Sequence, residues 1–206
     1  LPSPEAFAEA AGALGVGERD TIVVYDGAGM YSAARVWWTF RTMGADDVFV
    51  LDGGLPKWKS EGRRLDSGEP SPQRATFSPA FRPELVAGYD QVLARLGDLS
   101  AQIVDARPAA RFRADAPEPR AGLRGGHMPG ARSLPLGDLI AADGTLKPAG
   151  ELRRIMAAAG VDPQKPVTAS CGSGIAAAGV ALALARLREG PGARHGTAFT
   201  VSIEAA

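Results

Sequence analysis

Short apolar runs alternate with longer segments of helical periodicity along the chain. Runs rich in β-branched residues and bounded by polar residues or glycine predict strands at 21–26, 48–54, 101–107 and 165–170. Segments with apolar residues at helical spacing predict helices at 4–14, 30–44, 84–97, 150–160 and 175–188. Strands that alternate with helices in this way predict an α/β fold with mostly parallel sheets flanked by helices.

Turn-forming residues separate these elements. Ser3 is a candidate N-cap, with Pro4 at the first helical position. The segment 62–84 holds four prolines without a sustained period, so we interpret it as a linker. A turn is expected to close the strand at 48–54, and a long polar loop to follow the strand at 101–107.

The chain contains a weak internal repeat. A shift of 145 residues (171 − 26 = 145) places Asp26 on Cys171 and gives eight identities in 44 positions. The shared order of helix, glycine, strand, G-x-G turn and helix predicts two copies of one α/β unit. One copy carries aspartate at its turn and the other carries cysteine. The turn glycines that the shift pairs are Gly27 with Gly172 and Gly29 with Gly174.

The repeat predicts the domain organisation. We expect residues 1–62 to form the C-terminal half of a non-catalytic domain, 63–83 a linker, 84–190 a catalytic domain and 191–206 a divergent tail. The first copy is expected to lack its N-terminal half, because the counterpart of 101–131 would precede residue 1. The second copy is expected to lack its last strand and turn, because 193–203 does not repeat the pattern that follows position 48.

Charge and composition exclude several classes of protein. The 206 residues include 23 Lys and Arg and 23 Asp and Glu, so no net basic field favours nucleic acid or an anionic membrane. No apolar run approaches the roughly 18–20 residues that span a bilayer. One cysteine excludes an internal disulfide, and two histidines make a zinc site improbable. A lone cysteine suits a reducing compartment and no signal-like segment is present, so we expect a cytoplasmic location.

The single cysteine, Cys171, lies between a predicted strand and a predicted helix. Ligands bind at this edge of the sheet in open α/β folds. Gly172 and Gly174 allow backbone N–H groups to converge, the helix adds its positive end, and Ser173 offers a hydroxyl donor. These features favour a nucleophilic thiolate. The alternative is a buried structural cysteine beside a turn, and the G-x-G pattern with its aspartate-bearing sister makes that alternative weaker.

Other nucleophile chemistries fit less well. A cysteine phosphatase loop needs an arginine six residues after the cysteine, where this chain has Ala177. A serine hydrolase elbow, G-x-S-x-G, needs glycine at position 171. A cysteine protease needs a histidine base, and no local pattern assigns that role to His127 or His195. The protease class stays open at this stage.

Five segments carry a family signature when they are taken together: CGSGIA, VVYDGAGMYSAARVWW, VFVLDGGLPKW, DARPAARF and EPRAGLRGGHMPGA. They resemble the two-domain rhodanese family over residues 1–188, and Gly172 and Ser173 after the cysteine resemble its 3-mercaptopyruvate branch. The resemblance implies tandem rhodanese-like domains. It also implies sulfur transfer from 3-mercaptopyruvate, or thiosulfate, through a Cys171 persulfide, with release of pyruvate. It implies no cofactor, and an acceptor that is cyanide or a thiol such as a thioredoxin-like protein.

The resemblance also implies roles for individual residues. Arg111 and Arg120 match the two arginines that bind the carboxylate of the donor, and a planar guanidinium suits that group. Tyr31 would face the cleft, and Asp26 would leave its half a supporting role. The active loop would comprise Cys171, Gly172, Ser173, Gly174, Ile175 and Ala176, with Ala176 where the family usually has threonine.

The remaining candidates are predicted to be structural. We expect His127 in GHMPGA to orient a turn, because the resemblance places the relay histidine in a first-domain motif that this chain lacks. Asp105 and Arg107 are expected to hold loops by hydrogen bonds. The tryptophans expected in the core or between the halves are Trp37, Trp38 and Trp58. Two rival hypotheses are a non-catalytic rhodanese-like binding or regulatory module and an inactive fragment of the enzyme.

Overall fold

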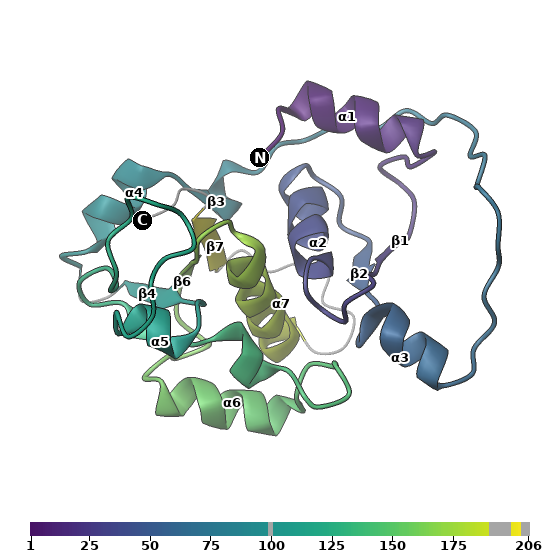
Figure 1. Cartoon of the computed structure of the whole chain (residues 1–206). Coiled ribbons are helices and arrows are strands. Elements are labelled where there is room, and N and C mark those ends of the chain that lie inside the picture. The colour runs from purple at the N-terminus through teal and green to yellow at the C-terminus, as the bar shows by residue number, and fades with distance from the viewer. Residues whose placement is uncertain (99–100, 190–198, 203–206) are drawn as a thin grey trace.

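The computed structural model describes residues 1–98, 101–189 and 199–202 (Figure 1). The α-helices are α1 (Pro4–Ala13), α2 (Ala33–Thr42), α3 (Gly54–Ser60), α4 (Tyr89–Arg95), α5 (Ala109–Phe112), α6 (Ala149–Ala158) and α7 (Ile175–Glu189). Two 3₁₀ turns, η1 (Pro83–Leu85) and η2 (Leu136–Leu139), lie in the second half. Ser3 caps α1 as predicted, because its Oγ accepts a hydrogen bond from Ala6 N at 3.2 Å.

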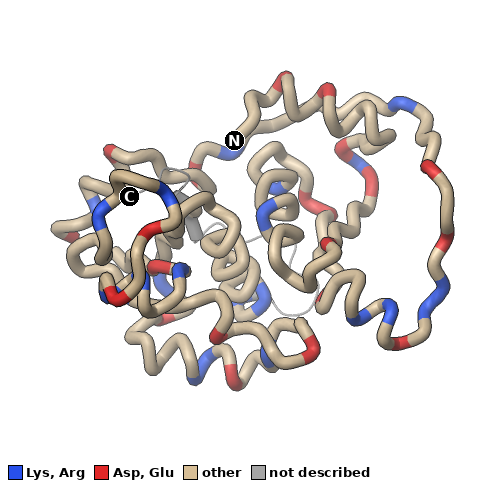
Figure 2. Tube along the Cα trace, in the orientation of Figure 1, with Lys and Arg blue, Asp and Glu red and all other residues tan. Residues whose placement is uncertain are grey.

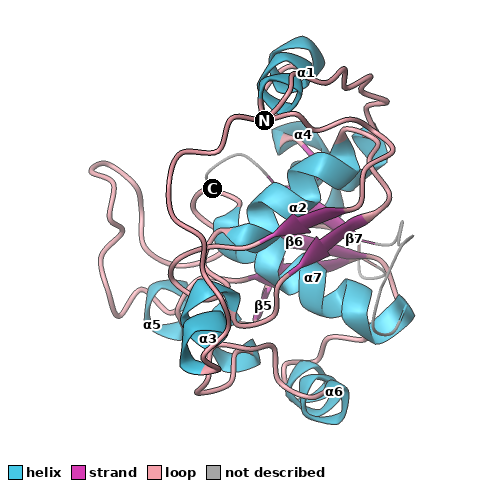
Figure 3. Ribbon diagram, turned by 90° about the vertical axis from the view of Figure 1, so that its right-hand side faces the viewer, coloured by secondary structure: helices cyan, strands magenta, loops and turns pink. Residues whose placement is uncertain are grey.

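All strand pairs in the two sheets are parallel. The larger sheet has the order β3-β7-β6-β4-β5, and the smaller one pairs β1 with β2. Helices lie on either side of the strands (Figure 3). The predicted α/β architecture with parallel sheets is confirmed. The strands are β1 (Ile22–Val24), β2 (Val48–Val50), β3 (Val86–Ala87), β4 (Gln102–Asp105), β5 (Arg132–Ser133), β6 (Val167–Ser170) and β7 (Phe199–Ser202).

The expectation that the second copy lacks its last strand is wrong. β7 lies between β3 and β6, and Val167 pairs with Phe199 as Ile22 pairs with Val48 in the first copy. Ile22 and Val167 are 145 positions apart (167 − 22), whereas their partners Val48 and Phe199 are 151 positions apart (199 − 48). The second copy therefore has six extra residues between its two paired strands. Those extra residues hid the strand from an ungapped comparison. Residues 191–198 and 203–206 of the predicted tail lie outside the described part.

The strand predicted at 21–26 is shorter and less buried than expected. β1 covers only Ile22–Val24, and the exposed fractions are 56% for Val23 and 57% for Tyr25. Within the described residues, β1 pairs with β2 alone. A two-stranded sheet leaves one edge of each strand and part of one face open, so an apolar run here does not imply burial.

Three further predictions about local structure need correction. The strand expected at 48–54 ends at Val50, and the turn after it, at Asp52 and Gly53, leads directly into a helix, α3, that was not predicted. A second such helix, α5, occupies the start of the loop expected after β4. The helix expected at 84–97 begins only at Tyr89, after η1 and the two-residue strand β3. Gly88 starts this helix, and its N–H donates to Gln91 Oε1 at 3.0 Å. Elements this short leave little periodicity to detect.

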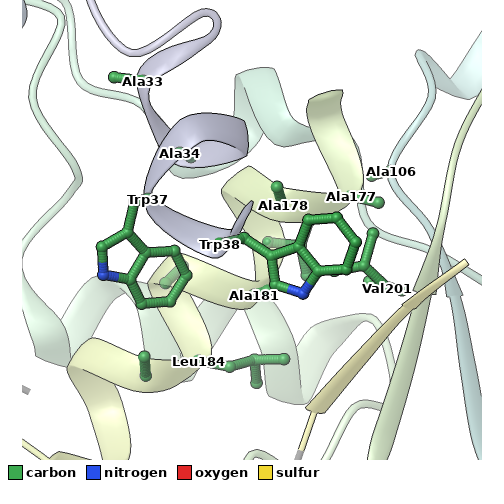
Figure 4. Packing of buried hydrophobic residues seen from close by; sticks show 14 of the residues in the cluster. Ala33, Ala34, Trp37, Trp38, Ala106, Ala177, Ala178, Ala181, Leu184 and Val201 are labelled. Atoms are coloured by element: carbon green, nitrogen blue, oxygen red, sulfur yellow. The ribbon is translucent and has the colours of Figure 1, made fainter. Parts of the chain in front are cut away.

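The two halves share one hydrophobic core, built where α2 packs against α7. Trp37 and Trp38 project from α2 toward the small side chains of α7 (Figure 4). Both indoles are almost fully buried, and Trp38 Nε1 donates to Leu85 O at 3.2 Å in the second half. Alanines on α7, such as Ala178 and Ala181, provide the space for the indoles. The predicted anchoring role of these two tryptophans is confirmed, whereas Trp58 is half-buried and its Nε1 binds Arg64 O at 2.9 Å.

Polar contacts also join the halves. Asp52, in the turn after β2, accepts from Arg186 Nη1 at 2.9 Å and from Leu146 N at 2.7 Å. Residues 62–82, which include most of the predicted linker, hold no helix or strand. Their second part is nevertheless packed, because the Phe77 ring lies 5.3 Å from that of Phe7 in α1. The second part of the linker therefore runs along the first half before the chain enters the second, whereas the part directly after α3 loops away from it (Figure 1).

Acidic and basic residues are interspersed along the trace (Figure 2). This distribution agrees with the equal numbers of positive and negative side chains in the sequence. Among the described residues, the search for a helix both long and apolar enough to cross a membrane finds none.

Candidate active site

Cys171 lies directly after β6, at the carboxyl edge of the larger sheet. Its exposed fraction is 7%, and its Sγ accepts a hydrogen bond from Gly174 N at 3.0 Å. Gly174 has φ +78°, a left-handed conformation that disfavours any side chain, and α7 begins at the next residue. The backbone therefore curls around the sulfur and directs an N–H group at it, as the sequence pattern predicts.

The sister turn in the first half binds an anion that belongs to the chain itself. The Asp26 carboxylate accepts from Ala28 N at 2.9 Å, Ser32 N at 2.7 Å and Ala33 N at 2.8 Å. Burial opposes ionisation, but the N–H groups of this turn outweigh it and hold the pKa of Asp26 below its ordinary value. The two turns therefore both direct backbone N–H groups at a side-chain acceptor, a carboxylate in one and a sulfur in the other.

Arg111, in α5, lies against the cysteine loop. A Cβ placed on Gly172 would be 3.4 Å from Arg111 Nη2, so the guanidinium sits directly over the residue after the nucleophile. The same guanidinium forms an ion pair with Glu118, whose side chain is only 4% exposed. The hydrogen bond from Arg111 is the main reason that the pKa of Glu118 is lowered; burial opposes it, and the charge of Arg107 adds to it. Glu118 was not predicted as a site residue, although it stands two positions before Arg120 in the segment EPR.

Arg107 holds the loop beneath the cysteine. Its guanidinium donates to Asp105 Oδ2 at 2.6 Å, to Glu118 Oε1 at 2.9 Å and to the Gly126 carbonyl at 2.6 Å. The bond to Asp105 raises the pKa of Arg107 further. The predicted loop-holding role of this pair is confirmed. A small cavity lies beside the network and is lined by Asp105, Arg107, Glu118, Leu123, Met128, Ser170, Cys171 and Gly172.

The other predicted site residues lie at the surface or at the helix start. Ser173 and Arg120 are exposed, and Tyr31 is 63% exposed. Ile175 and Ala176 are half-buried in the first turn of α7. Within the described residues, neither Arg120 nor Tyr31 forms a hydrogen bond or ion pair with the cysteine loop, so their roles remain predictions. The structure brings Arg111 to the loop and leaves Arg120 and Tyr31 open to a ligand from solvent.

His127 has structural contacts. Its Nδ1 lies 2.8 Å from the Phe112 carbonyl, and its ring stacks on Phe112 at 3.7 Å between centroids. These contacts hold the loop before β5 against the end of α5, as expected of a structural histidine. A search of the described residues for three or more His, Cys, Asp or Glu side chains that could hold a metal ion finds no such group.

Comparisons with known proteins agree with this geometry. The model of the rhodanese-like domain family matches residues 1–61 and 89–200. The 3-mercaptopyruvate sulfurtransferase of Escherichia coli K12 is 46% identical over 187 residues, an alignment that covers 91% of this chain and 66% of that protein. The mitochondrial thiosulfate/3-mercaptopyruvate sulfurtransferase 1 of Arabidopsis thaliana is 42% identical over 208 residues, covering 91% of this chain and 55% of that protein.

Solved structures show the same fold. The crystal structure of SseA from Escherichia coli, described as that of a 3-mercaptopyruvate sulfurtransferase, superposes with a TM-score of 0.85 at 40% identity. It covers 100% of this chain and 74% of that one. The chain spans 55% of the Arabidopsis relative and 66% of the Escherichia coli relative.

Proposed function

Because this chain belongs to the rhodanese family, we propose that it is a sulfurtransferase in which Cys171 carries sulfur as a persulfide, with 3-mercaptopyruvate as donor. The observation that carries the proposal is the hydrogen bond from Gly174 N to Cys171 Sγ at 3.0 Å, made at the carboxyl edge of the sheet. An N–H group aimed at sulfur favours the thiolate, which is the nucleophilic form.

The proposed reaction moves one sulfur atom in two displacements. The Cys171 thiolate attacks the thiol sulfur of 3-mercaptopyruvate, and an S–S bond forms while the carbon–sulfur bond breaks. The bonding electrons leave with the carbon as the enolate of pyruvate, which takes up the proton of the transferred S–H group. Attack of an acceptor on the outer sulfur then releases the Cys171 thiolate. Cyanide leaves as thiocyanate, and a thiol leaves as its own persulfide.

We assign the carboxylate of the donor to Arg111. Its guanidinium lies over Gly172, on the loop that carries the nucleophile. A guanidinium fork matches a planar carboxylate in geometry and charge. Glu118 holds this group in the structure, so a bound donor would share or replace that contact. We extend the proposal to Arg120 and Tyr31 as outer contacts of the donor and to Ser173 as a hydroxyl donor to the transferred sulfur.

The exposed side of the cysteine loop suits a macromolecular acceptor as well as cyanide. Ser173 is exposed, so a thiol on a small protein such as a thioredoxin-like protein can approach the persulfide from there. Such an exchange requires reduced thiols, which the cytoplasm maintains. We therefore keep the cytoplasm as the proposed compartment.

Mass spectrometry of the intact chain tests the proposal directly. After treatment with 3-mercaptopyruvate and removal of excess donor, we expect a gain of about 32 Da, one sulfur atom, on the peptide that contains Cys171. Pyruvate should appear in equal amount, and cyanide should restore the original mass while forming thiocyanate. Thiosulfate is the comparison donor.

Cys171→Ser is the matched control, because this is the only cysteine in the chain. The variant should gain no sulfur and release no pyruvate. A wild-type protein that melts cooperatively yet forms no adduct with either donor would instead indicate a non-catalytic rhodanese-like module.

A further inference from the structure

Arg35 in the first half of the chain lies against the cysteine loop of the second half. A Cβ built on Gly174 would overlap Nη1 of Arg35 and lie 3.1 Å from its Cζ. The guanidinium therefore occupies the space that the missing side chain of Gly174 leaves. Gly174 is the residue whose N–H binds the Cys171 sulfur, so Arg35 is separated from the nucleophile by one backbone unit.

The guanidinium of Arg35 is held in place but not neutralised. Its Cζ lies 4.6 Å from the centre of the Trp38 ring, and Nη1 is buried without a hydrogen-bond partner among the described residues. No carboxylate of the described part forms an ion pair with it. The guanidinium therefore keeps a donor group beside the loop that an anion there can accept from.

The other charges around Cys171 cancel one another. Arg111 from α5 and Arg107 after β4 face the loop, and both are paired with carboxylates, those of Glu118 and Asp105. Arg35 from α2 is thus the uncompensated positive charge of this group. Burial lowers the pKa of Arg35, whereas the charge of Cys171 acts in the opposite direction, so the two groups interact electrostatically.

We propose that Arg35 is a positioning residue of the Cys171 site, through which the non-catalytic half supplies the positive charge that stabilises anionic sulfur. It packs on Gly174, keeps the N–H of that residue directed at the sulfur, and offsets the charge of the thiolate and of the persulfide anion. The inference rests on the proposed function only in taking Cys171 as the reacting sulfur. It assigns the first half a chemical role, although Asp26 prevents sulfur transfer there.

Alkylation of Cys171 by iodoacetamide across a pH series tests this inference. The reaction reports thiolate, requires no sulfur donor, and has one target because the chain has one cysteine. In Arg35→Met, the pH of half-maximal reactivity should rise by about one unit, which lowers the rate about tenfold at pH values below both midpoints. Arg35→Lys, which keeps the charge, should stay within about threefold of the wild type. Arg63→Met is the matched control, because Arg63 also stacks on a tryptophan, at 5.1 Å from Trp58, and its side chain is 55% exposed.

Two results would overturn the inference. One is an unchanged pH profile in a cooperatively melting Arg35→Met variant. The other is an equal shift in the Lys and Met variants, which would indicate packing alone. If the Met variant does not melt cooperatively, Arg35→Gln is compared with Arg35→Lys in the same way. Because alkylation is independent of sulfur transfer, an altered profile in a chain that forms no persulfide would separate the two proposals.

Discussion

Asp26 and Cys171 stand at the same position of two equivalent turns, and each accepts hydrogen bonds from the backbone of its own turn. Gly29 and Gly174, three residues further on, have φ values of +76° and +78°. The strands that precede these turns also pair alike: the first residue of β1 pairs with the first residue of β2, and the first residue of β6 pairs with the first residue of β7. The two turns therefore have the same backbone conformation, which directs N–H groups at one side chain, while the accepting atom differs between the copies.

Replacement of Asp26 should destabilise the fold in a manner that depends on pH. Asp26→Ala removes an acceptor of three backbone N–H groups, so we expect the free energy of unfolding to fall by about 1–3 kcal/mol at pH 7. The pKa of Asp26 is lowered by folding, so the charged form stabilises the protein above the unfolded value, near 4, and this contribution disappears as pH falls through the lowered folded value.

Urea unfolding at pH 7 and at lower pH measures this effect. The difference between wild type and Asp26→Ala should shrink on acidification. Asp66→Ala, at an exposed ion pair, should change stability by less than about 0.5 kcal/mol at either pH. A difference of constant size across the pH range would contradict the prediction.

Trp38 should be the main link between the halves. Trp38→Ala is expected to cost about 3–5 kcal/mol, because the side chain is fully buried between α2 and α7. Trp38→Phe keeps most of the apolar contact and loses the hydrogen bond to Leu85 O, so its cost should be about 1 kcal/mol. Trp58→Phe loses a similar bond at a half-buried site and serves as control in urea unfolding. Equal costs at the two tryptophans would argue against a shared core.

The sequence predicted the parts of the fold that depend on local pattern. The strand before Cys171, the glycine turn and the following helix are all where their residue types placed them. β3 and α5 were not predicted, because elements of two and four residues show no measurable hydrophobic period. β7 was not predicted, because extra residues shift it relative to the corresponding strand of the first copy.

Long-range partners could not be predicted in the same way. Arg35 is one arginine on an amphipathic helix, and such a residue ordinarily faces solvent. Only the packing of α2 on α7 shows that it reaches Gly174, which is 139 positions away (174 − 35 = 139). Glu118 was hidden for the same reason, because its importance comes from two arginines that fold onto it.

The effect of replacing Arg111 or Arg120 on KM should depend on the charge of the sulfur donor. Alanine at either position is expected to raise KM for 3-mercaptopyruvate about tenfold or more, which corresponds to about 1.4 kcal/mol of lost carboxylate binding. An uncharged donor such as an organic trisulfide should show a much smaller change. Arg113→Ala, at an exposed ion pair with Asp115, is the control. Equal changes for both donors would remove the carboxylate-binding assignment.

Gly174 and Arg35 should be energetically coupled, and a double-mutant cycle measures the coupling. Gly174→Ala forces a side chain into a left-handed conformation, at about 1–2 kcal/mol, and also displaces the Arg35 guanidinium. In an Arg35→Ala background only the conformational cost should remain, so the substitution should be cheaper there by urea unfolding. Gly29→Ala is the matched control, because its φ is +76° and its nearest neighbour would be Gly53 O at 3.4 Å rather than an arginine. Its cost should be the same in both backgrounds, whereas an unchanged cost for Gly174→Ala would show that Arg35 does not fill the space beside the loop.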